Sequence, residues 1–139
     1  MRYYLDTNLL IFILQNEDDN ISYKLKELLK DYSNSLLVSS VVVEELLFLL
    51  RIGKLSKITP FKKEVDYLSA ISELRISIEY FNKNHFFVYS KLNLANNHKD
   101  MNDHLIISQA ISDKIPLISS DSKFEEYSSQ GLKFIYNKR

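Results

Sequence analysis

Apolar and polar residues are distributed along the chain in a pattern that predicts short buried strands separated by helices. Brief apolar runs bounded by Ser, Asn, Asp or Lys have the length of buried strands. The predicted strands are residues 2–5, 35–38, 76–78, 116–119 and 133–136. They are spaced so that helical segments fit between them.

The intervening segments show helical spacing of their apolar residues. In residues 22–30, for example, Leu25, Leu28 and Leu29 share one face and the lysines lie on the other. Ser39 or Ser40 is expected to cap one helix, Gly53 to follow its end, and Pro60 to lie near the first turn of the next. The predicted helices are residues 8–14, 22–30, 40–51, 61–74, 81–92, 103–112 and 122–127. Residues 94–102 are predicted to be a polar loop.

Strands that alternate with helices favour an α/β layered fold with a mainly parallel sheet. In such sheets, functional sites form beyond the carboxyl ends of the strands. The length of 139 residues suits a single domain, 1–139.

The composition argues against several classes of protein. Cysteine is absent, which excludes disulfides and thiolate zinc sites. The apolar runs 9–14 and 46–50 are too short to span a bilayer, and the first residues lack the apolar stretch of a signal peptide. The expected protein is soluble and cytoplasmic, without contact to a membrane.

The formal net charge is zero, whereas proteins that bind nucleic acid through bulk electrostatics are usually basic. Any nucleic-acid binding is therefore expected to depend on metal ions or on local lysine patches. Lys54, Lys57, Lys62 and Lys63 form one such group. We interpret them as solvated surface, with RNA contact as the alternative.

Two acids directly follow predicted strands. Asp6 comes after residues 2–5, and Asp121 comes after residues 116–119 and Ser120. Each has a structural alternative as a helix N-cap. Because the ends of parallel strands lie on one side of a sheet, the two carboxylates are expected to converge.

A third acid, Glu45, lies on an apolar helix stripe that includes Val41 and Phe48, whereas its neighbour Glu44 shares a polar face with Arg51. A carboxylate among apolar residues needs a cation or a proton. The alternative is an edge position near the start of the helix.

A fourth acid, Asp103, begins the predicted helix 103–112 and lies above its core-facing side. The polar stripe of that helix is expected to be His104, Ser108 and Ser112. The alternative role for Asp103 is a capping interaction with Asp100 as N-cap.

Several carboxylates close together repel one another unless a divalent cation neutralises them. All-oxygen ligands select Mg²⁺ or Mn²⁺ over zinc. The three histidines, His85, His98 and His104, lack zinc-site spacing and are interpreted as surface residues. Residues 46–50 are apolar on all sides of their helix, which indicates packing under the next helix or a partner interface.

Four segments together resemble the ordered motifs of PIN-domain ribonucleases, close to the VapC-type toxins of bacterial toxin–antitoxin pairs. The segments are residues 4–8, 38–46 with their continuation 52–55, 98–105 and 116–121. In this comparison the family's core acids fall on Asp6, Glu45, Asp103 and Asp121. The sequence departs from the family where Met101 and Asn102 stand in place of a common aromatic residue, His104 in place of Arg, and Glu44 in place of a bulky apolar residue.

The resemblance implies a three-layer α/β sandwich and Mg²⁺- or Mn²⁺-dependent cleavage of RNA phosphodiesters by a metal-activated water. It also implies a homodimer, a cognate antitoxin that docks on the helical pair, and structured RNA targets such as tRNA or rRNA. Our hypothesis places the four acids at the metal and uses Thr7, Asn8 and Ser119 for supporting hydrogen bonds, with Asp100 further out.

Two rival hypotheses remain open. One is a catalytically inactive PIN-like module that binds RNA or protein. The other is a phosphatase or phospho-acceptor domain built on Asp6, which is disfavoured because no strand-end lysine is evident.

Overall fold

The centre of the computed structural model, which describes residues 1–55 and 64–138, is a five-stranded sheet. The strands lie in the order β3-β2-β1-β4-β5, and each described neighbouring pair is parallel. Their bounds are β1 Arg2–Leu5, β2 Ser35–Ser39, β3 Ser77–Glu79, β4 Leu117–Ser119 and β5 Phe134–Tyr136. The predicted parallel sheet is confirmed.

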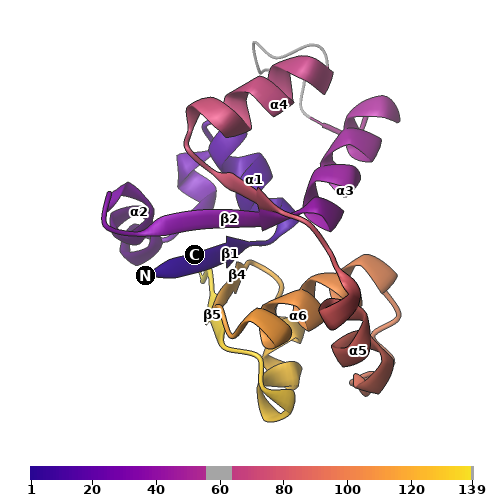
Figure 1. The fold of residues 1–139 in the computed structure, drawn as a ribbon. Coiled ribbons are helices and arrows are strands. Elements are labelled where there is room, and N and C mark those ends of the chain that lie inside the picture. The colour runs from indigo at the N-terminus through magenta and orange to yellow at the C-terminus, as the bar shows by residue number, and fades with distance from the viewer. Residues whose placement is uncertain (56–63, 139) are drawn as a thin grey trace.

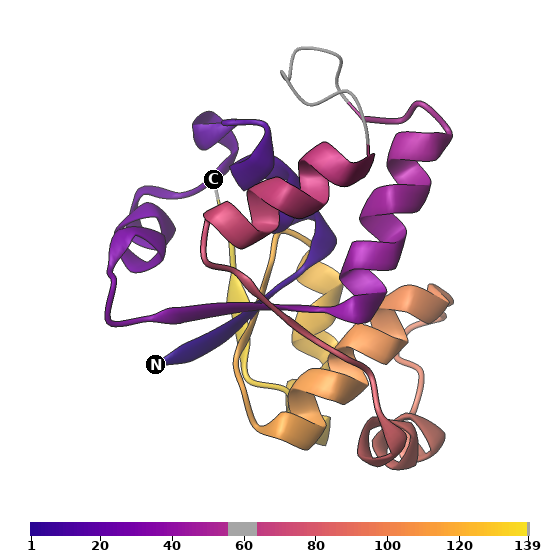
Figure 2. The ribbon, with the colours of Figure 1, turned by 45° about the horizontal axis from the view of Figure 1, so that its top comes forward.

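Helices cover both faces of this sheet, which makes the predicted three-layer sandwich (Figure 1 and Figure 2). On one side lie α1 (Thr7–Leu14), α3 (Ser40–Arg51) and α4 (Glu64–Glu73), with α2 (Tyr23–Lys30) near the amino ends of β1 and β2. On the other side lie α5 (Lys83–Lys91), α6 (Met101–Asp113) and the 3₁₀ helix η2 (Ser122–Gln130). No helix in the described ranges is long and apolar enough to cross a membrane.

Short polar side chains begin the helices at the strand ends. The side chains of Asp6, Ser39 and Asp121 accept hydrogen bonds from the backbone amides at the starts of α1, α3 and η2. These bonds satisfy amides that have no partner within the helix. Gly53 follows α3 with φ of 72°, a conformation that favours glycine, as expected for the end of this helix.

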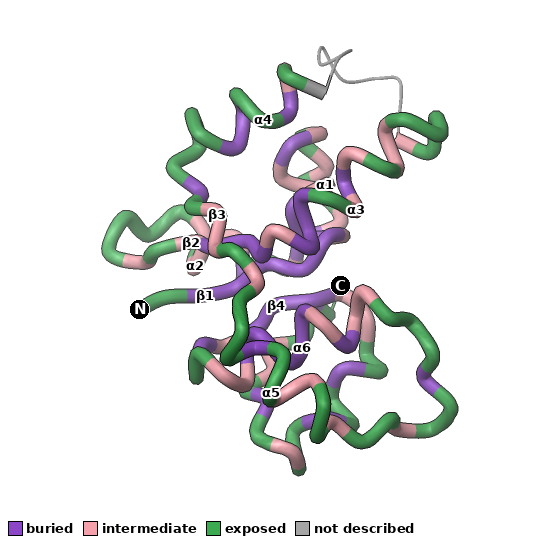
Figure 3. Tube along the Cα trace, turned by 45° about the vertical axis from the view of Figure 1, so that its right-hand side comes forward, coloured by how far each residue is buried: buried purple, intermediate pink, exposed green. Residues whose placement is uncertain are grey.

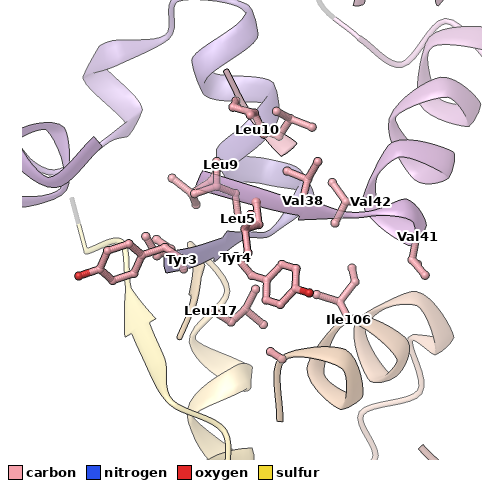
Figure 4. Packing of buried hydrophobic residues seen from close by; sticks show 14 of the residues in the cluster. Tyr3, Tyr4, Leu5, Leu9, Leu10, Val38, Val41, Val42, Ile106 and Leu117 are labelled. Atoms are coloured by element: carbon pink, nitrogen blue, oxygen red, sulfur yellow. The ribbon is translucent and has the colours of Figure 1, made fainter. Parts of the chain in front are cut away.

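Side chains of the central strand alternate between the two helical layers. Tyr4 points toward Ile106 of α6, whereas Leu5 points toward Leu9 of α1 (Figure 4). Because both faces of β1 are covered, Tyr4 and Leu5 are buried. The burial colouring shows the same contrast between the buried central strands and the largely exposed α5 (Figure 3).

One face of α3 provides a test of the core. Leu46 is fully buried, whereas Phe48 on the same helix is 55% exposed. We expect Leu46→Ala to lower the free energy of unfolding by about 2–5 kcal/mol, because it leaves a cavity in the core. Phe48→Ala should change it by less than about 0.5 kcal/mol. Urea denaturation of both variants measures the difference, and equal losses would contradict this packing.

The helix boundaries differ from the predictions in a few places. The helix α6 begins at Met101 rather than Asp103, because Asp100 is its N-cap. A short 3₁₀ turn, η1 (Asp18–Asn20), was not predicted, and η2 continues to Gln130. The first residues of the predicted helix 61–74 lie outside the described residues, and Lys62 and Lys63 are among them. Lys57 and Pro60, which precede that helix, also lie outside the described residues.

The prediction that the three histidines are surface residues is wrong. His85, His98 and His104 are 2%, 8% and 4% exposed. Burial of His85 is tolerated because its ring nitrogens have polar partners: Nδ1 accepts from the Asn82 amide, and Nε2 lies 2.9 Å from Asp113 Oδ1. The predicted polar stripe of α6 is also wrong at His104 and Ser108, since both residues are buried and the His104 ring packs against His98 and Tyr127.

Candidate functional site

The carboxyl ends of β1 and β4 place two of the predicted acids at one edge of the sheet. These strands are parallel neighbours, with Leu5 paired to Ile118, and the Asp6 amide donates to the Ile118 carbonyl at 2.9 Å. The chain order reverses between these strands, because the connections from β1 and from β4 lead to opposite sides of the sheet. Ligands of parallel α/β sheets bind beyond the strand ends at such a point.

Asp6 is the most enclosed of the four predicted acids, with an exposed fraction of 4%. Its Oδ1 accepts from the Thr7 amide at 2.8 Å, and its Oδ2 accepts from Ser119 Oγ at 2.6 Å and from Asn8 Nδ2 at 3.3 Å. Ser119 Oγ also accepts from the Asp121 amide at 3.0 Å. The buried Ser119 thereby connects the strand-end acids Asp6 and Asp121.

Glu45 is half-buried on α3, between the buried Val42 and the exposed Phe48, whereas Glu44 is exposed as predicted. Its Oε2 accepts from Asn102 Nδ2 at 3.0 Å. This hydrogen bond joins α3 to the first turn of α6, on which Asp103 lies.

Asp103 lies in the first turn of α6, with its side chain 15% exposed. Its amide donates to Asp100 Oδ1 at 3.2 Å, so the predicted capping interaction is present. Its Oδ2 lies 2.8 Å from His98 Nε2, and His98 Nδ1 lies 3.1 Å from the Tyr127 hydroxyl. Capping leaves the Asp103 carboxylate available for a second role, because only its backbone amide takes part.

The acids interact electrostatically. The pKa of Asp6 is raised to about 7, mainly by burial and also by the negative charges of Asp103 and Glu45, against the hydrogen bonds from Ser119 and the Thr7 amide. Burial also raises the pKa of Asp103 to about 7, together with the charges of Asp100, Asp121 and Glu45. Opposing this, Lys123 lowers the pKa of Asp103. The fold therefore concentrates negative charge, which Lys123 partly offsets at Asp103.

This excess of carboxylates fits a hard divalent cation in its donor chemistry. Within residues 1–55 and 64–138, however, no three acidic or histidine side chains are grouped closely enough to form a ready metal site. Asp6, Glu45 and Asp103 are instead each held by a hydrogen-bond partner: Ser119, Asn102 and His98. A cation would have to replace part of these contacts, and it would neutralise carboxylates whose pKa is raised by burial and by their neighbours' charges.

The residues predicted to support the acids, Thr7, Asn8 and Asp100, make different kinds of hydrogen bond. Asn8 bridges the two strand ends, since its side chain also accepts from the Ser120 amide at 3.2 Å. Thr7 supports Asp6 through its backbone amide, whereas its buried hydroxyl has no hydrogen-bond partner among the described residues. The hydrogen bond from Thr7 to Asp6 is thus made by the backbone, and Asp100 acts as the N-cap of α6.

Two residues that contact the acids were missed by sequence reasoning. His98 contacts Asp103, and Asn102 contacts Glu45. Neither residue stands in a sequence pattern that predicts such a contact. One signal was available for His98, because it stands in the same motif-bearing segment as Asp103. For Asn102 the pairing with α3 is visible only in the fold.

The family model described as PIN domain matches residues 3–129. No curated protein sequence matches the chain.

Several solved structures share the fold over almost their whole length. For a chain of VapBC2 from Rickettsia felis, bound to a promoter DNA fragment, the TM-score is 0.68 at 25% identity, with 99% of this chain and 100% of that chain covered. For VapBC-1 from nontypeable Haemophilus influenzae the TM-score is 0.67 at 21% identity, with both chains covered completely. For VapBC-5 from Mycobacterium tuberculosis it is 0.62 at 18% identity, with 97% and 98% covered.

Proposed function

The chain belongs to the PIN domain family, and we propose on that basis that it is a metal-dependent endoribonuclease, the toxin of a toxin–antitoxin pair. One observation carries the nuclease proposal. Asp6, Glu45 and Asp103 come from three separate parts of the chain, yet they lie close enough that the charges of Asp103 and Glu45 add to the burial that raises the pKa of Asp6. A cluster of this kind suits a site that binds a divalent cation and a phosphodiester.

The proposed roles follow from the contacts of each acid. Asp6, Glu45 and Asp103 would hold Mg²⁺ or Mn²⁺, and Asp121 would complete the acidic pocket. When bound, the cation supplies an activated water and offsets the charge of the phosphate. Ser119 and Asn8 would keep the Asp6 carboxylate oriented, because both donate to its Oδ2.

RNA is the proposed substrate, with tRNA or rRNA as the expected class. The chain has no net charge, so the attraction must be local. Lys123, whose charge lowers the pKa of Asp103, lies where it can meet a phosphate group near the acids. Its ammonium would help to offset the repulsion between RNA and the acidic pocket.

An antitoxin is the proposed protein partner. The structural relatives named above are VapBC toxin–antitoxin complexes, one of them bound to promoter DNA. On this chain, α3 and α4 expose large apolar side chains that would suit such a partner. They are Phe48, Ile52, Val65 and Leu68. We also propose that the chain forms a homodimer and acts in the cytoplasm.

Cleavage of RNA tests the nuclease proposal directly. Purified protein should cut RNA in the presence of Mg²⁺ or Mn²⁺ and should stop on addition of EDTA, because the acids alone provide no activated water. The assay uses total tRNA and rRNA separated on a denaturing gel. RNA binding without cleavage under all these conditions would instead favour an inactive RNA-binding module.

A further inference from the structure

A chain of hydrogen bonds leads through the interior to the Asp103 carboxylate. The Ala95 amide donates to the Tyr127 hydroxyl at 3.2 Å, and that hydroxyl lies 3.1 Å from His98 Nδ1. His98 Nε2 lies 2.8 Å from Asp103 Oδ2. Tyr127 is fully buried and His98 is 8% exposed, so the chain is sheltered from solvent until it reaches the acid.

A tight turn places His98 at this point. The His98 amide donates to the Ala95 carbonyl at 2.8 Å, and the two residues between them, Asn96 and Asn97, have φ of 48° and 58°. Positive φ at both central positions characterises a type I′ turn, and asparagine tolerates this conformation better than most residues do. The pair Asn96 and Asn97 is therefore the local sequence feature that directs His98 toward the start of α6.

The direction of the hydrogen bonds follows from the groups themselves. An ionised carboxylate only accepts, so His98 Nε2 carries the proton that Asp103 Oδ2 receives. In the neutral imidazole Nδ1 is then the acceptor, and the Tyr127 hydroxyl donates to it while its oxygen accepts from the Ala95 amide. The imidazole is thus held at both of its nitrogens.

Asp103 needs such support because like charges surround it. The negative charges of Asp100, Asp121 and Glu45 all act on its carboxylate. Repulsion of this kind favours rotation of the side chain away from the other acids. Among the described residues His98 is the one side chain that hydrogen-bonds to this carboxylate, and it binds Oδ2, which leaves Oδ1 available.

We propose that His98 is a positioning residue of the acidic site: the Tyr127–His98 pair fixes the Asp103 carboxylate so that its Oδ1 stays free for a divalent cation. The proposal rests on the function proposed above. Hydrogen-bond partners of metal-binding side chains keep the ligand oriented, and loss of such a partner weakens metal binding by about 10- to 100-fold. His98 acts through Asp103 and not on the substrate itself.

Two substitutions of His98 separate positioning from packing. His98→Phe keeps an aromatic ring among its buried aromatic neighbours but removes the donor to Asp103. His98→Gln loses the ring but keeps an N–H group that reaches a similar position. We expect His98→Phe to weaken Mn²⁺ binding about 10- to 100-fold and His98→Gln to stay within about threefold of wild type. A residue that only fills space would give the reverse order.

The buried pair of His85 and Asp113 provides the matched control. Its Nε2–Oδ1 distance is 2.9 Å and His85 is 2% exposed, but Asp113 ends α6, whereas Asp103 lies in its first turn. His85→Phe removes an equally buried histidine–aspartate contact, and it should leave the Mn²⁺ dissociation constant within about twofold because the two sites share no partner. Calorimetric titration of Mn²⁺ into the full chain at pH 8, without RNA, measures all of these variants, and circular dichroism shows whether each is folded.

Nitrogen-15 NMR of the histidine rings tests the geometry without metal. In EDTA we expect His98 to be the Nε2–H tautomer, because Nδ1 accepts from Tyr127. Tyr127→Phe removes only that hydroxyl, so it should shift the His98 ring resonances and leave those of His85 unchanged.

The outcomes separate this inference from the nuclease proposal. Wild-type Mn²⁺ affinity in His98→Phe, or a smaller loss there than in His98→Gln, would overturn the positioning role and leave a metal-dependent nuclease intact. An Nδ1–H tautomer of His98 would also overturn it. The expected order of Mn²⁺ affinities would support the role even if the wild-type chain cleaved no RNA, whereas a wild-type chain that binds no Mn²⁺ would overturn both proposals.

Discussion

Asp103→Asn is expected to reduce the rate of metal-dependent RNA cleavage by about a thousandfold or more while the protein stays folded. The substitution keeps the shape of the side chain and the backbone amide that donates to Asp100. It removes the negative charge that a cation would need at the centre of the acidic site. Single-turnover cleavage of a short RNA with Mn²⁺, beside a circular dichroism spectrum, measures both effects.

Adjacent glutamates on α3 provide the matched control for this prediction. Glu45→Gln should also impair cleavage strongly, whereas Glu44→Gln should leave the rate within about twofold, because Glu44 is exposed and Glu45 contacts α6 through Asn102. A wild-type rate for Asp103→Asn would contradict the assignment of this acid. Equal losses for both glutamate variants would indicate a general charge effect instead of a specific site.

In the absence of metal, the melting temperature is expected to fall as the pH rises from 5 to 8. The ordinary pKa of an aspartate is 3.8, whereas the pKa of Asp6 and of Asp103 in the folded chain is about 7. The folded state therefore holds more protons than the unfolded state between these values. The stabilisation is complete below about pH 4 and is lost as the pH rises through about 7, by up to about 1.4 kcal/mol per pH unit for each carboxyl.

Mn²⁺ should reverse this loss, because the cation competes with protons for the same carboxylates. It is expected to raise the melting temperature at pH 8 and to have little effect at pH 5. Asp6→Asn should flatten the pH dependence without metal and weaken the response to Mn²⁺, whereas Glu44→Gln should change neither. An equal response to Mn²⁺ at both pH values would show that the ion binds elsewhere, and a melting temperature that is constant with pH would contradict the raised pKa values.

The order of strands and helices is determined by local sequence signals. Apolar runs such as residues 2–5 and 116–119 could be recognised as strands because burial on both faces requires continuous apolar residues. Helix starts at Asp6 and Ser39 could be predicted because capping needs a short polar side chain next to the first turn, whereas the start of α6 was placed two residues late. Parallel strands then place Asp6 and Asp121 at the same edge of the sheet, and the sequence alone was enough to expect this.

The partners of the acids are decided only by the tertiary structure. The contacts of Asn102 with Glu45 and of His98 with Asp103 depend on how α6 and its preceding segment pack, and no local pattern encodes them. The same packing buries His98 and His104, which the sequence placed at the surface. A histidine is polar enough to suit the surface and has a ring large enough to pack in the interior, so spacing alone cannot place it. Glu45 and Asn102 are 57 residues apart, so they meet only when the helical layers assemble, whereas His98 and Asp103 are near in the chain but meet only through the packing of the segment before α6.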